Sequence, residues 1–136
     1  MHNNIERALH IFEQLAFIRR IHLAVMEEVL LPSFINTVVK IPAGAKVLYF
    51  EREKKQIMKY LDKYSRVLGN ILLHSSEIDI VSLFEDYAWF KDLLDHHDAR
   101  EKAFLFPTLE KIAQDKKQQI LNEISIRLKV LEQELQ

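Results

Sequence analysis

The scarcity of chain-breaking residues is the feature that most restricts the fold of this chain. Two glycines and three prolines occur in 136 residues, whereas a β-rich fold of this length needs turn residues after every short strand. Apolar residues make up 49% of the chain and charged residues 29%, a balance typical of globular rather than disordered proteins. We therefore predict an all-α protein, and the length predicts a single domain over residues 1–136.

Four segments repeat apolar residues at helical spacing. The clearest loop between them is 41–44, which holds a proline and a glycine. Ser75 and Ser76 separate the second and third segments, Pro107 ends or kinks the third, and the first can extend past Pro32. Long helices joined by short loops bury their apolar faces as an antiparallel up-and-down four-helix bundle. The predicted helices cover residues 4–31, 45–74, 79–106 and 111–134.

Each predicted helix carries an apolar stripe for the bundle core. Residues that recur every three or four positions share one face of a helix, and in all four segments such residues are mostly large and apolar. The predicted stripes are Ile5, Leu9, Phe12, Leu15, Ala16, Leu23, Val29 and Leu30, then Phe50, Ile57, Leu61, Tyr64, Leu68 and Leu72, then Leu83, Tyr87, Phe90, Leu94 and Leu105, and finally Leu109, Ala113, Ile120, Ile124, Leu131 and Leu135.

Charge and composition exclude several classes of protein. The chain has 19 Lys and Arg against 20 Asp and Glu, a formal net charge of −1, so it lacks the basic excess typical of nucleic-acid-binding proteins. It contains no apolar run of about 18 residues for a transmembrane helix, and charges interrupt the N-terminal segment where a signal peptide needs an apolar stretch. Without cysteine it has neither disulfides nor thiolate metal ligands. We expect a cytoplasmic protein with neither a nucleic-acid nor a membrane partner.

Three polar side chains interrupt the stripes and are candidates for a site. His97 and Glu101 lie four residues apart on the third predicted helix and therefore project from one face, one turn apart. His22 lies on the apolar face of the first helix. A buried polar group is costly unless it is hydrogen-bonded, paired or bound to a metal. The three residues therefore predict either a metal site or core histidines held by a carboxylate.

Further residues extend both interpretations. His96, at the edge of the third stripe, and His74, at the end of the second helix, are candidates to complete a metal site, although His74 is also placed to interact with the helix dipole. Arg19 and Lys54 fall on apolar stripes as well and need either an anionic partner or a path for their charged ends to reach solvent. Either of them paired with Glu101 would occupy the space of a metal ion. This ion pair is therefore the alternative hypothesis to a metal site.

Segment 22–32 is similar to segment 97–107. In each, a histidine precedes a proline by ten residues, with alanine and leucine at matching positions between them. A bundle made of two related helix pairs would bring the two histidines together in its core. Met26 stands in the first segment where Glu101 stands in the second.

The stretch from His96 to Pro107 (HHDAREKAFLFP) resembles the signature of the hemerythrin-like, HHE cation-binding family, with its histidine pair, an acid four residues after the second histidine and a Leu-Phe-Pro ending. The resemblance extends over residues 20–112, and it is specific in the stretch 96–107. It implies a four-helix bundle around a non-haem di-iron site and the binding or sensing of oxygen, nitric oxide or redox state. It also implies that His97, Glu101 and His22 are ligands.

The ligand set departs from the family pattern at two positions. Met26 stands where a second bridging carboxylate is expected, and Lys54 stands where another histidine is expected. One predicted function is therefore a hemerythrin-like metal-binding protein that uses one or two non-haem iron ions to sense or carry a small diatomic ligand. The alternative is a metal-free bundle without a cofactor that acts as an interaction or oligomerisation module, as a homodimer or with another protein. No nucleophile–base pair or phosphate-binding loop is present, so we do not expect an enzyme.

Overall fold

The computed structural model describes residues 2–74 and 77–135, without the side chains of residues 2, 3, 72, 74, 77–80, 82, 84 and 135. Every regular element in these ranges is helical, which confirms the prediction of an all-α protein for this part of the chain. The elements are α1 (His2–Val25), the π turn η1 (Met26–Leu30), α2 (Leu31–Thr37), the 3₁₀ turn η2 (Ala43–Ala45), α3 (Val47–His74), α4 (Glu77–Arg100), the π turn η3 (Glu101–Leu105), α5 (Phe106–Glu110) and α6 (Gln114–Leu135).

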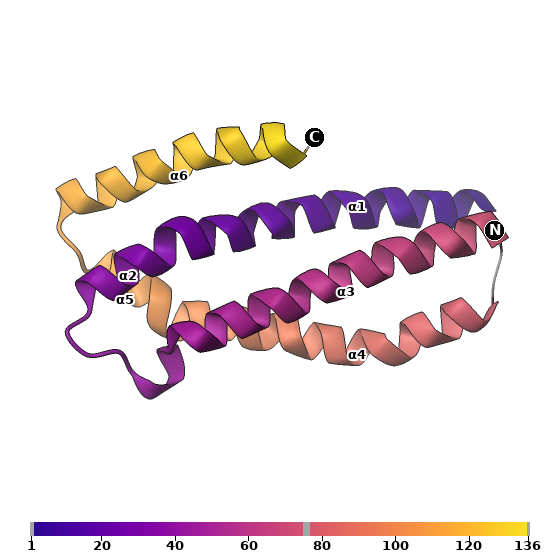
Figure 1. Cartoon of the computed structure of the whole chain (residues 1–136), viewed down its shortest axis with the longest axis horizontal. Coiled ribbons are helices and arrows are strands. Elements are labelled where there is room, and N and C mark those ends of the chain that lie inside the picture. Colours follow the sequence, from indigo (N-terminus) through magenta and orange to yellow (C-terminus); the bar gives the residue numbers. More distant parts are fainter. Residues whose placement is uncertain (1, 75–76, 136) are drawn as a thin grey trace.

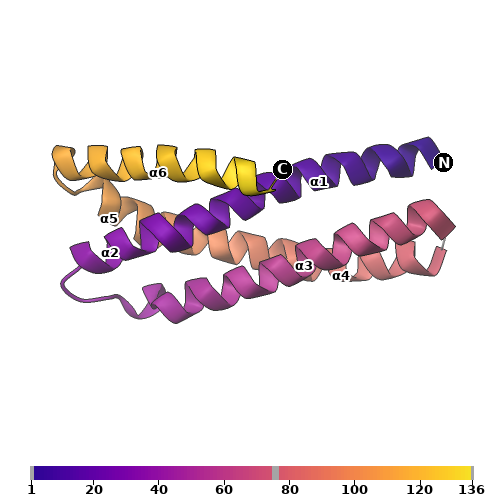
Figure 2. The same cartoon turned by 45° about the horizontal axis from the view of Figure 1, so that its top comes forward.

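Three helical rods lie side by side, and a fourth helix rests on one of them (Figure 1). One rod runs through α1, η1 and α2, another through α4, η3 and α5, and α3 packs against both α1 and α4. α6 packs against α1 and η1 on the side of α1 that faces away from α4 (Figure 1), and it ends beside the middle of α1 (Figure 2). Within the described ranges, no helix is both long and apolar enough to cross a membrane.

Two apolar clusters hold these elements together. The smaller cluster joins α1 to α6 through Ile21, Val25, Val29 and Leu131. The larger one joins the three rods, and a fully buried Leu, Ile or Phe in it contributes about 1.5–3 kcal/mol. Its buried members are Ala16, Leu23, Met26, Leu31, Phe34, Ala45, Phe50, Ile57, Leu61, Tyr64, Phe90 and Leu105.

The two π turns occupy equivalent places in their rods. η1 begins four residues after His22, and η3 begins four residues after His97. Each is followed by a short α-helix with a proline in its first turn. The similarity between segments 22–32 and 97–107 is therefore a similarity of backbone structure as well as of sequence.

Proline explains why the helices widen there. Pro32 and Pro107 have no N–H to donate, and a proline ring collides with the carbonyl four residues earlier in a regular α-helix. In η1 the N–H of Leu31 bonds instead to the carbonyl of Met26, five residues back, and a matching bond closes η3. The rods therefore continue through both prolines, and the one extra residue in each turn shifts the helical register that follows by about 100°.

Leu72 and Leu135 of the predicted stripes lie outside the described side chains, and among the other stripe positions three face solvent. Leu15 is 60% exposed and Tyr87 is 58% exposed, and both line the space between α1 and α4. Ala113 lies exposed in the coil before α6 rather than in a helix. Helical spacing places a residue on a face of its helix, but the face is buried only where another element of the fold covers it.

The two glycines give opposite predictions for substitution by alanine. A Cβ at Gly44 would lie 2.7 Å from Cζ of the Phe104 ring, so Gly44→Ala should lower the free energy of unfolding by about 1–3 kcal/mol. Gly69 lies inside α3 with open space around it, so Gly69→Ala should raise that free energy by about 0.5–1 kcal/mol. Chemical denaturation measures both changes, and a stabilised Gly44→Ala would contradict the packing of Phe104 against the η2 turn.

Candidate metal centre

Two histidines and a glutamate meet where the last turns of α1 and α4 pass into the π turns. His22 comes from the last turn of α1, His97 from the last turn of α4, and Glu101 from the first position of η3. His97 and Glu101 are fully buried, while the His22 side chain is 38% exposed. One ligand atom from each of the three lies within 4.8 Å of the other two. The chain therefore presents two imidazole nitrogens and a carboxylate to one point.

The Glu101 carboxylate lies between the two imidazoles. Nε2 of His22 is 2.9 Å from Oε1 and 3.0 Å from Oε2 of Glu101. Nε2 of His97 is 2.7 Å from Oε1, yet it makes no hydrogen bond of acceptable angle and is a buried polar atom without a partner. The His97 nitrogen thus converges on the carboxylate oxygen without pointing at it, which is how ligands of a shared ion are arranged.

A second carboxylate holds His97 from the other side. Nδ1 of His97 donates to Oε1 of Glu53 at 3.2 Å, and Arg100 donates to both oxygens of Glu53, at 3.0 Å from Nε and 3.2 Å from Nη2. Arg100 is itself fixed by a hydrogen bond to the Gly44 carbonyl and by stacking over the Tyr49 ring. With its proton on Nδ1, His97 keeps Nε2 free for the site, as outer-shell carboxylates do for metal-bound histidines.

Proton equilibria in the cluster are strongly displaced. Burial raises the pKa of Glu101, but the hydrogen bond from His22 and the close approach of the His97 imidazole outweigh it and lower that pKa to about 2. Burial lowers the pKa of His97, but Glu101 and Glu53 outweigh it and raise that pKa to about 9. The pKa of Glu53 also lies below its ordinary value, because His97 and Arg100 outweigh its burial. Without a metal, His97 is therefore a cation held between two carboxylates at neutral pH.

Among the residues predicted for the site, the structure brings His22, His97 and Glu101 together. His96 is not among them, since it is exposed and its Nδ1 donates to the Asp92 carbonyl at 2.7 Å. The side chain of His74, which ends α3, lies outside the described residues. The structure thus brings three of the five candidates to one point, leaves His96 away from it and does not describe the side chain of His74.

The predicted ion pair between Glu101 and Arg19 or Lys54 is wrong. Arg19 pairs with Asp98, with Nη1 and Oδ1 2.8 Å apart, and Lys54 pairs with Glu27 at 3.0 Å. Both cations are only partly buried, so their long side chains reach acids at the edges of their helices. Glu101 has the two histidines as its partners instead.

Sequence reasoning also missed Glu53 as a functional residue. The inward position of α3 at this level belongs to Glu53, which is 9% exposed, and Lys54 lies one residue, or about 100°, further around the helix. Glu53 is three residues after Phe50 and four before Ile57, so the stripe allowed either Glu53 or Lys54 to point inward. At the position that matches Glu101 in the other rod, Met26 is fully buried and offers a thioether in place of a carboxylate.

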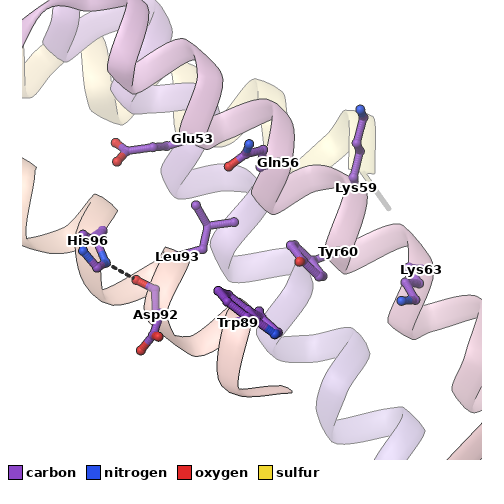
Figure 3. A pocket seen from close by; sticks show the side chains of 9 residues that line it. All are labelled: Glu53, Gln56, Lys59, Tyr60, Lys63, Trp89, Asp92, Leu93 and His96. Carbon is purple, nitrogen blue, oxygen red and sulfur yellow. Dashed lines mark hydrogen bonds between the residues drawn. The ribbon is translucent and has the colours of Figure 1, made fainter. Parts of the chain in front are cut away.

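A depression of about 630 Å³ opens between α3 and α4 and is lined in part by Glu53 (Figure 3). His96 lies in this depression, with its ring turned toward the Asp92 carbonyl (Figure 3). Its walls carry mixed charges and an exposed Trp89. The depression therefore borders the outer carboxylate of the site and does not contain the cluster of His22, His97 and Glu101. It is lined by Glu53, Gln56, Lys59, Tyr60, Lys63, Trp89, Asp92, Leu93 and His96.

The residues of the cluster fit one metal ion better than two. Two imidazoles and one carboxylate are the ligand types of the facial triad in mononuclear non-haem iron proteins, which leaves further coordination positions open. A dinuclear centre needs additional bridging and terminal ligands, and Met26 and Lys54 do not supply them. Comparison with protein-family models, with curated proteins and with solved structures finds no match for this chain.

Proposed function

We propose that this protein binds one divalent metal ion, non-haem iron foremost, through His22, His97 and Glu101 in a hemerythrin-like helical bundle. The convergence of three ligand atoms, with Nε2 of the buried His97 lacking any aligned hydrogen bond, is the observation that carries the proposal. A bound iron would supply open coordination positions for a small diatomic ligand. The protein would then act as a sensor or carrier of oxygen or nitric oxide rather than as an enzyme.

Each residue near the proposed ion has a separate task. Glu101 supplies the negative charge, and the two imidazoles supply neutral nitrogen ligands. Glu53 orients His97 and fixes its tautomer. Because one edge of His22 is exposed, a small molecule can reach the ion from that side.

Metal content tests the proposal directly. The protein is purified without an affinity tag under low oxygen, and iron, manganese and zinc per chain are measured by elemental mass spectrometry. We expect one metal per chain in the wild type and in His10→Ala, which changes an exposed histidine of α1, and none in His97→Ala. A folded wild type with substoichiometric metal, or metal retained by His97→Ala, would contradict the proposal.

Removing the negative charge behind His97 should weaken metal binding without abolishing it. Glu53→Gln leaves His97 without its carboxylate partner, and loss of such an outer-shell partner costs about 10–100-fold in metal affinity. The matched control is Glu51→Gln, which changes an exposed glutamate on the same helix and should keep wild-type affinity. Competition titration against a chelator measures both, and equal affinities would show that Glu53 does not orient a ligand.

Metal affinity should also increase with pH. His97 holds a proton up to a pKa of about 9, and an incoming ion must displace it. Below that pKa, each unit of pH that is removed should lower the apparent affinity by about tenfold. Anaerobic Fe²⁺ titrations between about pH 6 and pH 8 measure the slope, and a flat profile would mean that His97 is not a ligand.

The second candidate function is an interaction module without metal. It is favoured by a specific observation, the open apolar groove between α1 and α4. In that case the His22–Glu101–His97 cluster is a structural network in the core, in which the carboxylate is stabilised by its two imidazoles. Metal-free protein that stays folded would favour this function over the first.

A further inference from the structure

Helix α1 is apolar on three sides, whereas most helices of globular proteins are apolar on one. One side, with Ala16 and Leu23, faces the main core, and a second side, with Ile21 and Val25, faces α6. The third side has no cover in the described chain. It carries Ile11, Leu15 and Ile18, which are 46%, 60% and 62% exposed. We call these three residues the α1 stripe.

Two residues of the α1 stripe, Leu15 and Ile18, line a groove of about 650 Å³ between α1 and α4. On α1 the groove runs from Phe12 to His22, about 15 Å at the helical rise. Its far wall includes Tyr87, which is 58% exposed, and α3 forms its floor. Contiguous exposed apolar surface of this kind marks a protein–protein contact in soluble proteins. The floor consists of Leu61, Tyr64 and Leu68.

The groove has the shape that a helix fills. Two neighbouring helices above a third leave a channel in which a fourth helix lies in a four-helix bundle. α6 is the remaining long helix of the described chain, and it lies on the opposite side of α1 (Figure 2). Moving α6 into the groove would uncover Ile21, Val25 and Val29, so one exposed apolar face would replace another.

We propose that a second copy of this chain fills the groove, with the α1 stripe of each copy lying in the groove of the other. The stripe has the spacing of four and three residues that packs helices against each other in coiled coils. In each copy the α1 stripe is part of the groove wall, and it is also the ridge that enters the groove of the second copy. Two copies related by a two-fold axis therefore bury both stripes and both grooves in one interface. The formal net charge of −1 leaves little repulsion between the copies.

His22 and Glu101 also line the groove, at the end that lies beyond the last residue of the α1 stripe. The dimer rests on the apolar surface alone, so it is tested independently of whether the cluster holds a metal.

The mass of the protein in solution is the first test. Sedimentation equilibrium at tens of micromolar should give a dimer for the wild type and a monomer for Leu15→Glu, which places a charge at the centre of the stripe. The matched control is Ile126→Glu on α6, since Ile126 is 66% exposed and lies outside the groove, and this variant should stay dimeric. Circular dichroism establishes that both variants remain helical, and Ile18→Gln repeats the test without adding a charge.

A crosslink tests the arrangement. The chain has no cysteine, so a single Leu15→Cys supplies the only thiol. As the middle residue of the stripe, it lies nearest the two-fold axis, and oxidation should give a covalent dimer, whereas Ile126→Cys should not. A monomeric wild type, a Leu15→Glu as dimeric as the wild type, or a monomer that carries a small apolar molecule in native mass spectrometry would overturn the proposal.

Discussion

Replacing Glu101 by glutamine is expected to abolish metal binding and to lower the free energy of unfolding of the metal-free protein by roughly 3 kcal/mol. Glu101 is 1% exposed, and its carboxylate contacts both His22 and His97. Glutamine has the same size but no charge, so the His97 cation keeps Glu53 as its only anionic partner. A buried charge that loses its partner accounts for a loss of this size.

Chemical denaturation of chelator-treated protein, at one fixed protein concentration, measures this loss. The matched control is Glu110→Gln on α5, where the carboxylate is 81% exposed and 3.4 Å from Lys117. That change should stay within about 0.5 kcal/mol of the wild type. If Glu101→Gln were as stable as Glu110→Gln, the carboxylate would not be the centre of a buried network, and both the metal site and the structural network would lose their basis.

Phe34→Ala should have the second large effect, lowering the free energy of unfolding by about 3–5 kcal/mol. Phe34 follows Pro32 in the short helix α2 and is fully buried in the main core. Removing the ring deletes its apolar contacts and leaves a cavity that close-packed helices fill only in part. For a protein of this size the melting temperature should fall by roughly 10–20 °C.

The neighbouring residue provides the control. Ile35 is 42% exposed on the same turn of α2, so Ile35→Ala should cost about 0.5 kcal/mol or less. Thermal melts of both variants at equal concentration decide the comparison. If both variants lost the same free energy of unfolding, Phe34 would not face the core. The helical register of α2 after the π turn would then differ from the one described here.

The apolar stripes show how far local spacing leads. The stripe of α3 was predicted from periods of three and four residues, and Phe50, Ile57, Leu61 and Tyr64 are all buried. The same reasoning placed Leu15 and Tyr87 in the core, but the structure shows both side chains exposed. Both sets have helical spacing, and they differ only in whether another helix packs over them. That difference depends on the position of α6, which no residue of α1 specifies locally.

The histidine cluster shows the same division. His97 and Glu101 were paired correctly because a separation of four residues puts two side chains on one face of any α-helix. His22 joined them because a polar side chain on an apolar stripe needs a partner in the core. Lys54 was placed on the stripe of α3, and Glu53 was overlooked although it lies three residues after Phe50 and four before Ile57. Only the packing of α3 against α4 selected Glu53, which contacts His97 across 44 positions of sequence.

The sequence by itself determined the helices, most of their buried faces and three residues of the candidate site, because each of these depends on spacing within one helix. The tertiary structure alone decided which partner each charged group takes and which face of α1 stays open. Arg19 reaches Asp98 and His22 reaches Glu101 across 79 positions, and such contacts follow from how the rods pack. The π turns depend on both the sequence and the tertiary structure. The prolines signal an interruption of the helix, but only the packed rods show that the helix continues through it.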